Sequence, residues 1–329
     1  MTSNSKSEHP GPLSKKLTGA QPSIEACVKK LRFKPRDQLR LITASRLVQF
    51  EIEPRKKHWG KLIQSNQTGM LFGPRGCGKT WLAMAMALSM SSRVKFLGHG
   101  PRNARRVIYL DGEMDLVTIQ QRIKDLCVSL GIEPPAELRL FTPEVFTDLL
   151  PSINTPDGQR AIDEMIGTDW DVIFIDNYSA WSGDGRETAE AWAPMMRWML
   201  SHKRAGRSVI VIHHTGKTGM QRGSSSHEDA LDWSVSLKPI EDKVHDGALR
   251  FNLVWEKARH LPSDYTQPIA VCMKKGSNGA LAWEFQHGMH KDPKVEQAYA
   301  FKAQGMAVTE IAKKIGVNRT TVARWFKND

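Results

Sequence analysis

The sequence predicts an α/β protein: an open parallel sheet, extended by antiparallel strands after residue 233 and followed by a small all-α helix-turn-helix domain. Three observations lead to this fold class. A glycine-rich loop joins a short apolar strand to a long apolar helix, two later apolar strands end in acidic residues, and residues 291–329 have the pattern of a separate helical unit. Ligands of such sheets bind beyond the carboxyl ends of the strands, so we expect the functional residues there.

The length of the chain fits one large domain with appendages. With 329 residues it exceeds the roughly 200 to 250 residues that still close a single core. We expect a disordered tail at 1–20, which is rich in Ser, Pro, Gly and Lys, and a lead-in helix and linker at 21–60. The catalytic core is expected at 61–290 and the helix-turn-helix domain at 291–329.

The basic charge of the chain lies outside the expected core. The net charge is +12, yet residues 61–290 carry 26 Lys and Arg against 26 Asp and Glu. Residues 1–60 and 291–329 together carry 21 against 9. Basic appendages of this kind are typical of proteins that meet a polyanion, and nucleic acid is the natural candidate. The alternative is that the flanks only keep the protein soluble.

The composition gives no sign of secretion or of a membrane. The four cysteines are far apart, without the paired spacing of a zinc knuckle or a disulfide framework. No apolar run approaches the roughly 18 to 20 residues that span a bilayer, and the first 20 residues lack an apolar signal core. We therefore expect a cytoplasmic protein without a membrane partner.

The strongest motif is "GPRGCGKT", which fits the phosphate-loop pattern G-x-x-x-x-G-K-[ST] between a strand at 69–72 and a helix at 80–90. Glycines let backbone amides approach phosphates, and the helix N-terminus adds its positive dipole. Lys79 is expected to reach the terminal phosphates of ATP and Thr80 to ligate Mg²⁺. The expected nucleotide-binding residues are Gly73, Gly76, Gly78, Lys79, Thr80 and Trp81.

Two later strands carry carboxylates at their ends. Asp176 follows four apolar β-formers directly, which is the usual position of the magnesium-side partner of a phosphate loop. Glu113 lies just past a strand at 107–110 and is expected to activate the attacking water. Asp111 and Asp115 are the alternatives for that role, and either is otherwise a capping or surface acid.

A further strand at 208–212 ends in His213 and His214. A histidine pair at this strand end points toward the γ-phosphate, so we expect it to relay the nucleotide state to the following loop. A satisfied core histidine is the alternative. Metal ligation by the pair is unfavourable, because successive side chains leave an extended backbone on opposite sides.

The loop that follows is rich in Gly, Ser and Thr and includes the cations Lys217 and Arg222. Its composition makes it flexible, and its position directly after the histidines suggests a lever that grips or releases a second ligand. Cations among backbone-donating glycines and serines suit a phosphate backbone. An ordinary long surface loop is the alternative.

Six motifs now stand in order across about residues 41–285: "GPRGCGKT", "VIYLDGEM", "DVIFIDN", "VIVIHHTGK", "QRGSSSHEDALD" and "WEKARH". This ordered set resembles the RecA-like ATPases of the plasmid RepA type, which are hexameric replicative helicases related to the DnaB group. The resemblance covers roughly three quarters of the chain. It implies a RecA-like core that assembles into a homo-oligomer, most simply a hexamer.

Within the nucleotide site, the resemblance assigns Lys79 and Thr80 to nucleotide and magnesium. It makes Glu113 the catalytic base and Asp176 the acid of the second strand. His214 takes the place of the polar γ-phosphate sensor.

Outside that site, the resemblance matches Arg222, Gly223 and Ser224 to the loop that holds single-stranded DNA in the ring channel. Lys257 and Arg259 match a Lys-x-Arg pair that reaches the nucleotide of the neighbouring subunit as an arginine finger. A surface pair on an edge strand is the alternative for these two residues.

The C-terminal segment "VTEIAKKIGVNRTTVARWFK" presents Ala312, Gly316 and Val322 at the spacing of a helix-turn-helix. A small Ala lets the helices cross closely, Gly makes the turn, and Val packs the second helix, which is expected to begin near Asn318. A protein-binding module is the alternative. The side chains expected to meet duplex DNA are Arg319, Thr320, Thr321, Arg324 and Lys327.

Together these features predict an ATP-driven, ring-forming motor on single-stranded DNA, a replicative helicase of a plasmid, phage or other mobile element. Two alternatives stay open. One is a DNA-bound ATPase switch that loads or regulates a transposase, repair recombinase or initiator without unwinding. The other is a sequence-specific regulator whose oligomerisation is tuned by nucleotide.

Overall fold

A computed structural model describes most of the chain, with gaps. The expected DNA-loop residues Lys217, Arg222, Gly223 and Ser224 lie outside the described residues, as do the side chains of Arg324 and Lys327. The chain divides into two compact units, Met1–Pro54 and Arg55–Asp329. The larger unit thus begins a few residues before the boundary at 61 that we expected. The described stretches are 31–32, 41–145, 150–183, 189–214, 230–240, 247–276, 279–288 and 293–327.

The smaller unit holds three short elements. Strand β1 (Leu31–Arg32) pairs in parallel with β2 (Phe50–Glu51), and α1 (Ala44–Leu47) lies between them in the sequence. The Thr43 hydroxyl caps α1 by accepting a hydrogen bond from the backbone N–H of Arg46. No residue of α1 is buried.

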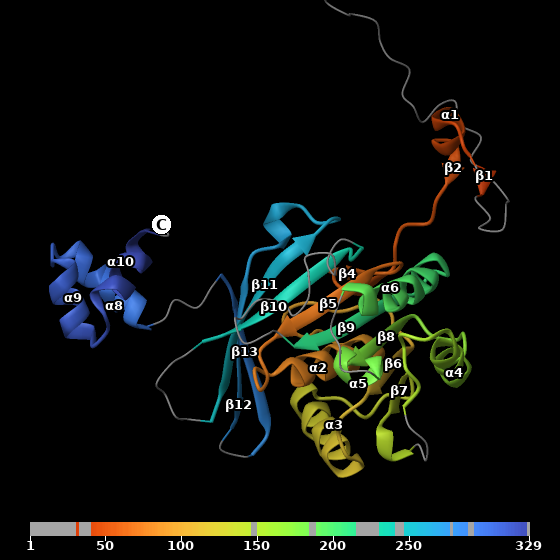
Figure 1. Ribbon diagram of the computed structural model, residues 1–329, viewed down its shortest axis with the longest axis horizontal. Coiled ribbons are helices and arrows are strands. Elements are labelled where there is room, and N and C mark those ends of the chain that lie inside the picture. Colours follow the sequence, from red (N-terminus) through yellow and green to blue (C-terminus); the bar gives the residue numbers. More distant parts are fainter. Residues whose placement is uncertain are drawn as a thin grey trace, which may run out of the picture. The chain divides into compact units, whose positions relative to one another are not determined.

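A nine-stranded sheet forms the centre of the larger unit (Figure 1). A hairpin of β3 (Lys57–Trp59) and β4 (Ile63–Gln64) precedes it. The strands of the sheet are β5 (Thr68–Gly73), β6 (Val107–Asp111), β7 (Leu138–Phe141), β8 (Val172–Asp176), β9 (Ser208–His214), β10 (Trp233–Pro239), β11 (Leu249–Ala258), β12 (Ile269–Lys275) and β13 (Leu281–His287).

The strand order is β13-β12-β11-β10-β5-β9-β8-β6-β7. Neighbours from β10 to β7 pair in parallel, whereas β11, β12 and β13 pair antiparallel. This confirms the predicted α/β fold with a parallel sheet and an antiparallel extension. One detail differs: β10, the first strand after residue 233, runs parallel to β5, so the extension begins one strand later, with β11.

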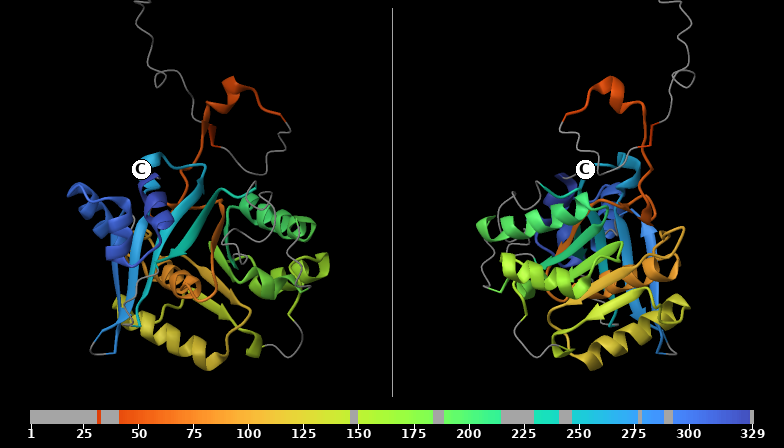
Figure 2. Two further views of the ribbon diagram at one scale, coloured as in Figure 1. Left: turned by 60° about the vertical axis from the view of Figure 1, so that its left-hand side comes forward. Right: turned by 90° about the vertical axis from the view of Figure 1, so that its right-hand side faces the viewer.

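Helices cover both faces of the parallel part of the sheet (Figures 1 and 2). One apolar cluster packs α2 and α3 on one face, and a second packs α4, α5 and α6 on the other. The bounds are α2 (Lys79–Ser92), α3 (Leu116–Leu130), α4 (Pro156–Ile166), α5 (Tyr178–Ser182) and α6 (Ala189–Arg204), with short 3₁₀ turns η2 (Pro143–Val145) and η3 (Ser263–Tyr265).

Burial on both faces explains the continuous apolar strands. Leu71 of β5 packs with α2, while its neighbours Met70 and Phe72 pack in the opposite cluster. Successive side chains of a strand point to opposite faces of the sheet. In a strand that is covered on both faces, every position is therefore buried and favours an apolar residue. Helix α2 is likewise buried along nearly all of its length, as expected for a helix that is apolar all round.

One glycine allows an unusually close approach between neighbouring strands. A Cβ atom at Gly69 of β5 would lie 2.0 Å from the indole of Trp233 on β10. Trp233 is fully buried and pairs directly with Gly69. Only the bare backbone of glycine leaves room for that ring, so the pair fixes the junction between β5 and β10.

The C-terminal segment holds three helices around a small core of its own. These are α8 (Pro293–Ala303), α9 (Val308–Ile315) and α10 (Arg319–Lys327). Gly316 ends α9 with φ +69°, and its backbone N–H donates to the Ala312 carbonyl, as in a left-handed cap. Arg319 and Thr320 are exposed and Thr321 is half-buried.

No helix within the described stretches combines the length and apolarity needed to cross a bilayer.

Candidate active site

The phosphate loop connects the carboxyl end of β5 to the first turn of α2. Gly78, the N-cap of α2, has φ +95°, and Gly76 has φ +76°. Both values lie in the left-handed region that favours glycine. A Cβ at Gly73 would lie 2.7 Å from the Leu237 carbonyl oxygen. Each glycine of the motif therefore stands where a side chain would strain or clash, which leaves backbone amides exposed to a ligand.

Lys79 is the first residue of α2 and lies almost entirely within the loop. Its Nζ donates to the carbonyl oxygens of Gly73 at 2.9 Å and Pro74 at 2.7 Å. Only 4% of Lys79 is exposed, and burial lowers the pKa of its amine. An ammonium held over the loop in this way lies where the phosphates of a nucleotide would bind.

Asp176 ends β8 beside the loop, as expected from its place after an apolar strand. Its Oδ2 accepts a hydrogen bond from the Tyr109 hydroxyl at 2.6 Å, and the Thr80 side chain is close enough to lower the pKa of the same carboxyl. Burial raises the pKa of Asp176, while the Tyr109 hydroxyl and the Thr80 side chain oppose the rise. A hydroxyl and a carboxylate are the oxygen ligands that Mg²⁺ prefers, so Thr80 and Asp176 fit a magnesium nucleotide.

Trp81 follows the motif but lies against a neighbouring helix. Its ring centroid is 4.8 Å from the guanidinium carbon of Arg122 on α3, and the side chain is partly buried against the core. This cation–π contact accounts for the position of the indole. A contact between Trp81 and nucleotide stays a prediction.

Asp111 ends β6 and pairs in register with Asp176. It is 1% exposed, and its Oδ2 accepts the backbone N–H groups of Glu113 at 3.1 Å and Met114 at 2.7 Å. Burial raises the pKa of Asp111 to about 7, against the effect of these donors. The carboxyl therefore holds the turn that carries Glu113 rather than facing solvent.

The other two acids of this segment have different environments. Asp115 is the N-cap of α3 and accepts the backbone N–H of Thr118 at 2.7 Å. Glu113 is exposed, and its charge is close enough to shift the pKa of Lys79, Asp176 and His214. Of the three acids, Glu113 alone is both exposed and adjacent to the groups of the phosphate loop, which suits a base for water.

His214 ends β9 directly opposite Gly73. Its Nε2 lies 3.2 Å from Nδ2 of Asn177, whose Oδ1 accepts the backbone N–H of Ala180. The Asn177 amide nitrogen therefore faces the ring, so Nε2 accepts and the hydrogen is assigned to Nδ1. Burial, assisted by the charge of Lys79, lowers the pKa of His214 to about 4. At neutral pH His214 is an uncharged ring beside the phosphate loop.

His213 lies on the other side of the strand. It is fully buried, and its ring packs edge-on against Tyr178 at 5.7 Å and lies 6.2 Å from Trp192. The alternation of β9 thus separates the predicted pair. His214 lies with the phosphate loop, and His213 lies in the apolar cluster under α5 and α6.

Lys257 and Arg259 lie at the opposite end of the sheet. Ala258 pairs with Trp233, which pairs with Gly69 near the start of β5. Arg259 is exposed and Lys257 is half-buried. The structure therefore does not bring these two residues to the phosphate loop of their own chain.

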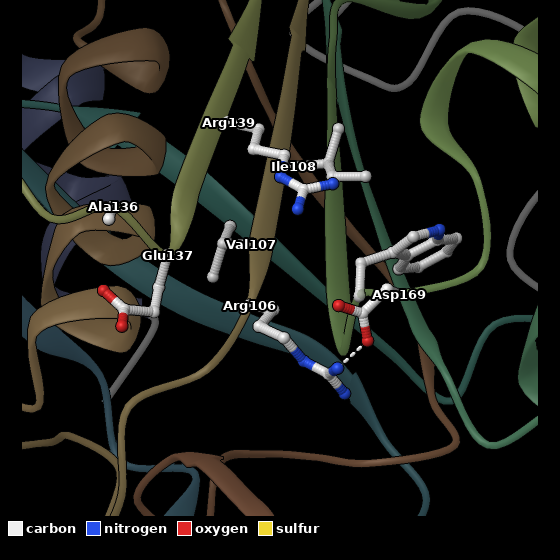
Figure 3. A pocket seen from close by; sticks show the side chains of 8 residues that line it. Arg106, Val107, Ile108, Ala136, Glu137, Arg139 and Asp169 are labelled. Carbon is white, nitrogen blue, oxygen red and sulfur yellow. Dashed lines mark ion pairs between the residues drawn. The ribbon is translucent and has the colours of Figure 1, made fainter.

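A small pocket of about 130 Å³ also lies away from the phosphate loop (Figure 3). It opens at the amino ends of β6 and β7 and includes an ion pair between Arg106 and Asp169. Ligands of open parallel sheets bind at the carboxyl ends, and none of the predicted site residues lines this pocket. Its lining is Arg106, Val107, Ile108, Ala136, Glu137, Arg139, Asp169 and Trp170.

The prediction missed three residues that shape the site: Tyr109, Asn177 and, as a holder of the Glu113 turn, Asp111. A detectable signal existed for Tyr109, since its hydroxyl is the polar group within the apolar run "VIYL". Asn177 directly follows the predicted magnesium ligand. Their partners are distant in sequence, so only the strand order reveals their contacts.

Comparison with known proteins places the chain in a family. It is similar to solved structures, among them a KaiC-like protein of Pyrococcus horikoshii OT3, with 14% identity, a TM-score of 0.48 and coverage of 70% of this chain and 100% of that one. Another is the flagellar accessory protein FlaH of Methanocaldococcus jannaschii, with 13% identity, a TM-score of 0.44 and coverage of 67% and 90%. None of the curated proteins matches the sequence. Residues 32–220, more than half of the chain, match the family described as "AAA domain". The chain therefore belongs to the AAA domain family, and its phosphate loop is that of a P-loop ATPase.

Proposed function

We propose that this protein is an ATP-driven, ring-forming motor that moves on single-stranded DNA, a replicative helicase of a plasmid, phage or other mobile element. The observation that carries the proposal is the separation, within one chain, of the phosphate loop from Lys257 and Arg259. Together with the RecA-like motif order, this separation favours an active site completed by a neighbouring subunit.

The distance argues against a role within the same subunit. Gly73 lies four residues along β5 from Gly69, about 13 Å at the rise of a strand. Strand β11 is two strands away from β5, about 10 Å in the perpendicular direction. The combined span exceeds an arginine side chain, so Arg259 does not reach the nucleotide of its own subunit. A closed ring, with six subunits as the expected number, gives every site such a neighbour.

The second support is the position of His214. It lies beside the phosphate loop, and residues 215–229 follow it directly in the chain. In this proposal a neutral His214 reads the γ-phosphate, and Lys217, Arg222, Gly223 and Ser224 grip single-stranded DNA. A change of one phosphate contact then alters the DNA grip through a few residues of continuous chain.

The C-terminal helices supply a second contact with DNA in this proposal. The segment 291–329 is basic, and Arg319, Thr320 and Thr321 occupy the first turn of α10. A helix N-terminus with an exposed cation and hydroxyl suits the phosphates and base edges of a major groove, and Arg324 follows later in the same helix. This domain would recruit the motor to duplex DNA.

The test measures ATP hydrolysis with and without single-stranded DNA, together with strand separation of a forked duplex, for the wild type and Lys79→Ala. The proposal expects DNA-stimulated hydrolysis and strand separation, both lost in the variant. Stimulated hydrolysis without strand separation would favour a DNA-bound switch or loader. Deletion of residues 291–329 should preserve hydrolysis and single-strand binding, and a loss of all activity would favour a sequence-specific regulator.

A further inference from the structure

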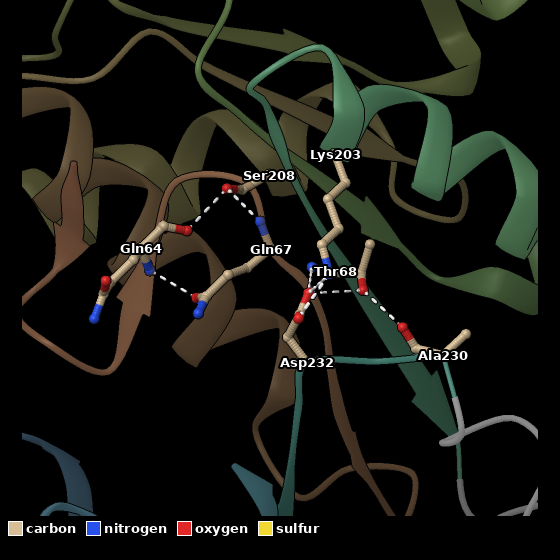
Figure 4. Close-up of polar contacts among 7 residues, drawn as sticks. All are labelled: Gln64, Gln67, Thr68, Lys203, Ser208, Ala230 and Asp232. Carbon is tan, nitrogen blue, oxygen red and sulfur yellow. Dashed lines mark hydrogen bonds and ion pairs between the residues drawn. The ribbon is translucent and has the colours of Figure 1, made fainter. Parts of the chain in front are cut away.

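A buried polar cluster lies at the end of the sheet opposite the phosphate loop (Figure 4). Its centre is Asp232, which is 7% exposed and directly precedes β10. The Asp232 carboxylate accepts from the backbone N–H of Thr68 at 2.8 Å and from the Thr68 hydroxyl at 3.2 Å. Lys203, near the end of α6, donates to both carboxylate oxygens at 2.7 Å. The cluster thus joins α6, β5 and β10.

The backbone of Asp232 extends these contacts to Arg259. Its N–H donates to the Thr68 carbonyl at 2.9 Å, and its carbonyl accepts the N–H of Arg259 at 3.0 Å. The Asp232 residue therefore holds β5 with its carboxylate and N–H, and holds Arg259 with its carbonyl. A displacement of Asp232 would therefore also move the backbone of Arg259, to which the guanidinium side chain is attached.

A β-bulge in β11 determines which face the preceding cation occupies. Val235 pairs with Trp255, but the next residue back, Ser234, pairs with Lys257, so Glu256 is skipped. Without the extra residue, Lys257 would lie on the same face as Trp255, whose ring packs on Trp233. The bulge instead turns Lys257 to the opposite face. Bulges of this kind commonly redirect a side chain near a site.

The turn after Arg259 is also held on the chain. The His260 Nε2 atom lies 3.2 Å from the Leu62 carbonyl oxygen. Lys61 Nζ donates to the Tyr265 hydroxyl at 2.6 Å and lies over the same ring. The backbone is thereby fixed on both sides of Arg259, while the side chain of Arg259 itself is exposed.

We infer that Asp232, held by its ion pair with Lys203, is a positioning residue that aims Arg259 at the nucleotide of the neighbouring subunit. The inference rests on the proposed function, because it presumes that Arg259 acts in trans. A finger contributes most when its guanidinium is already oriented before the transition state forms. The Asp232 cluster supplies that orientation, and it lies at the end of the sheet opposite the phosphate loop of the same subunit.

An ion pair that served stability alone would behave differently from a positioning device. It would weaken every function of the subunit that carries the change. A positioning role for Arg259 instead damages only the site of the next subunit and leaves the subunit's own phosphate loop competent. Mixed oligomers separate these two cases.

The experiment uses the full chain and measures DNA-stimulated hydrolysis of Lys203→Met, alone and mixed with Lys79→Ala. Lys79→Ala subunits lack a working phosphate loop but supply an intact Arg259. We expect Lys203→Met alone to lose about 10- to 100-fold in hydrolysis rate, the effect of a small misplacement, while binding ATP normally. Mixing with Lys79→Ala should restore hydrolysis, and mixing with Arg259→Ala should not.

A second test variant and two controls make the result decisive. Asp232→Asn repeats the test with the Thr68 contact preserved, in case Lys203→Met folds poorly. Lys203→Arg should retain most of the wild-type rate, and Lys274→Met, which removes the exposed pair with Glu284 on β12 and β13, should behave as wild type.

Two outcomes would overturn the inference. The first is a wild-type rate of hydrolysis in both Lys203→Met and Asp232→Asn. The second is a loss of hydrolysis in Lys203→Met that mixing with Lys79→Ala does not restore, although a mixture of Lys79→Ala and Arg259→Ala is active. If Lys79→Ala and Arg259→Ala fail to restore each other, the trans-acting site itself is wrong, and the proposed function falls together with this inference.

Discussion

Replacement of Tyr109 by phenylalanine removes one hydroxyl from the metal side of the site and nothing else. The Tyr109 ring is fully buried and stacks on Phe174 at 5.7 Å, and the phenylalanine ring of the variant would keep that contact. The lost atom is the donor to Asp176 at 2.6 Å. Of the two side chains that hold the pKa of Asp176 down, the variant would keep only Thr80. The substitution should therefore weaken Mg²⁺ binding without disturbing the fold.

The magnitude follows from the charge of the acceptor. A hydrogen bond to an ionised group contributes about 1.5 to 3 kcal/mol, which corresponds to roughly a 10- to 150-fold change in affinity. The sign with pH follows as well. The Tyr109 hydrogen bond holds the pKa of Asp176 down against burial, so its loss raises that pKa further. Protons then compete better with Mg²⁺, and the defect should grow as the pH falls.

The assay is the hydrolysis rate as a function of Mg²⁺ concentration at several pH values. For Tyr109→Phe, the Mg²⁺ concentration at half-maximal rate should rise at least about tenfold, with a smaller change in the rate at saturation. Tyr299→Phe, which removes a hydroxyl that bonds to the Trp325 carbonyl in the C-terminal helices, is the matched control and should follow the wild type. A wild-type Mg²⁺ dependence in Tyr109→Phe would refute the role of this hydrogen bond.

Three further predictions concern the core, the pH response and the base. Gly69→Ala should lower the free energy of unfolding by about 3 kcal/mol, because the new Cβ would lie 2.0 Å from the Trp233 indole. Urea unfolding measures this loss. The same loss from Gly69→Ala in a Trp233→Leu background would contradict the steric cause. Burial lowers the pKa of His58 from 6.5 to about 3. The contribution of the neutral, buried His58 ring to the free energy of unfolding is therefore complete above pH 6.5. That contribution is lost as the pH falls toward 3, by at most about 1.4 kcal/mol per pH unit. His58→Phe should flatten the acid side of the stability curve, and an unchanged slope would argue against a buried neutral ring. Glu113→Gln should bind ATP like the wild type and hydrolyse it about 10²- to 10⁴-fold more slowly in single-turnover experiments. A reduction of only a few-fold would exclude Glu113 as the base.

The central strands were predictable because their signals are local. β5, β6 and β8 each combine an uninterrupted apolar run with a glycine or aspartate at its end, and the structure places them within one or two residues of the expectation. Strand β7 was not anticipated. It is a short edge strand whose sequence, "LRLF", includes a charge and whose middle residues are exposed. Edge positions lose the apolar pattern that burial on two faces imposes.

The phosphate loop was predictable for the same reason, whereas the contacts that orient it were not. Tyr109 and Asp176 meet because β6 and β8 are neighbours, and Asn177 meets His214 because β8 lies beside β9. A strand order is set by long-range packing and has no local sequence signal. The separation of His213 from His214 is different, because the alternation of a strand already implies that adjacent histidines face opposite sides.

The decisive experiment on a motor with a finger in trans is strand separation of a forked duplex, measured for the wild type and Arg259→Ala alongside ATP binding by the same samples. We expect the wild type to separate the strands, and Arg259→Ala to bind ATP but neither to hydrolyse it at a comparable rate nor to separate them. Strand separation by Arg259→Ala at the wild-type rate would contradict a finger in trans. DNA-stimulated hydrolysis by the wild type without any strand separation would contradict the motor itself.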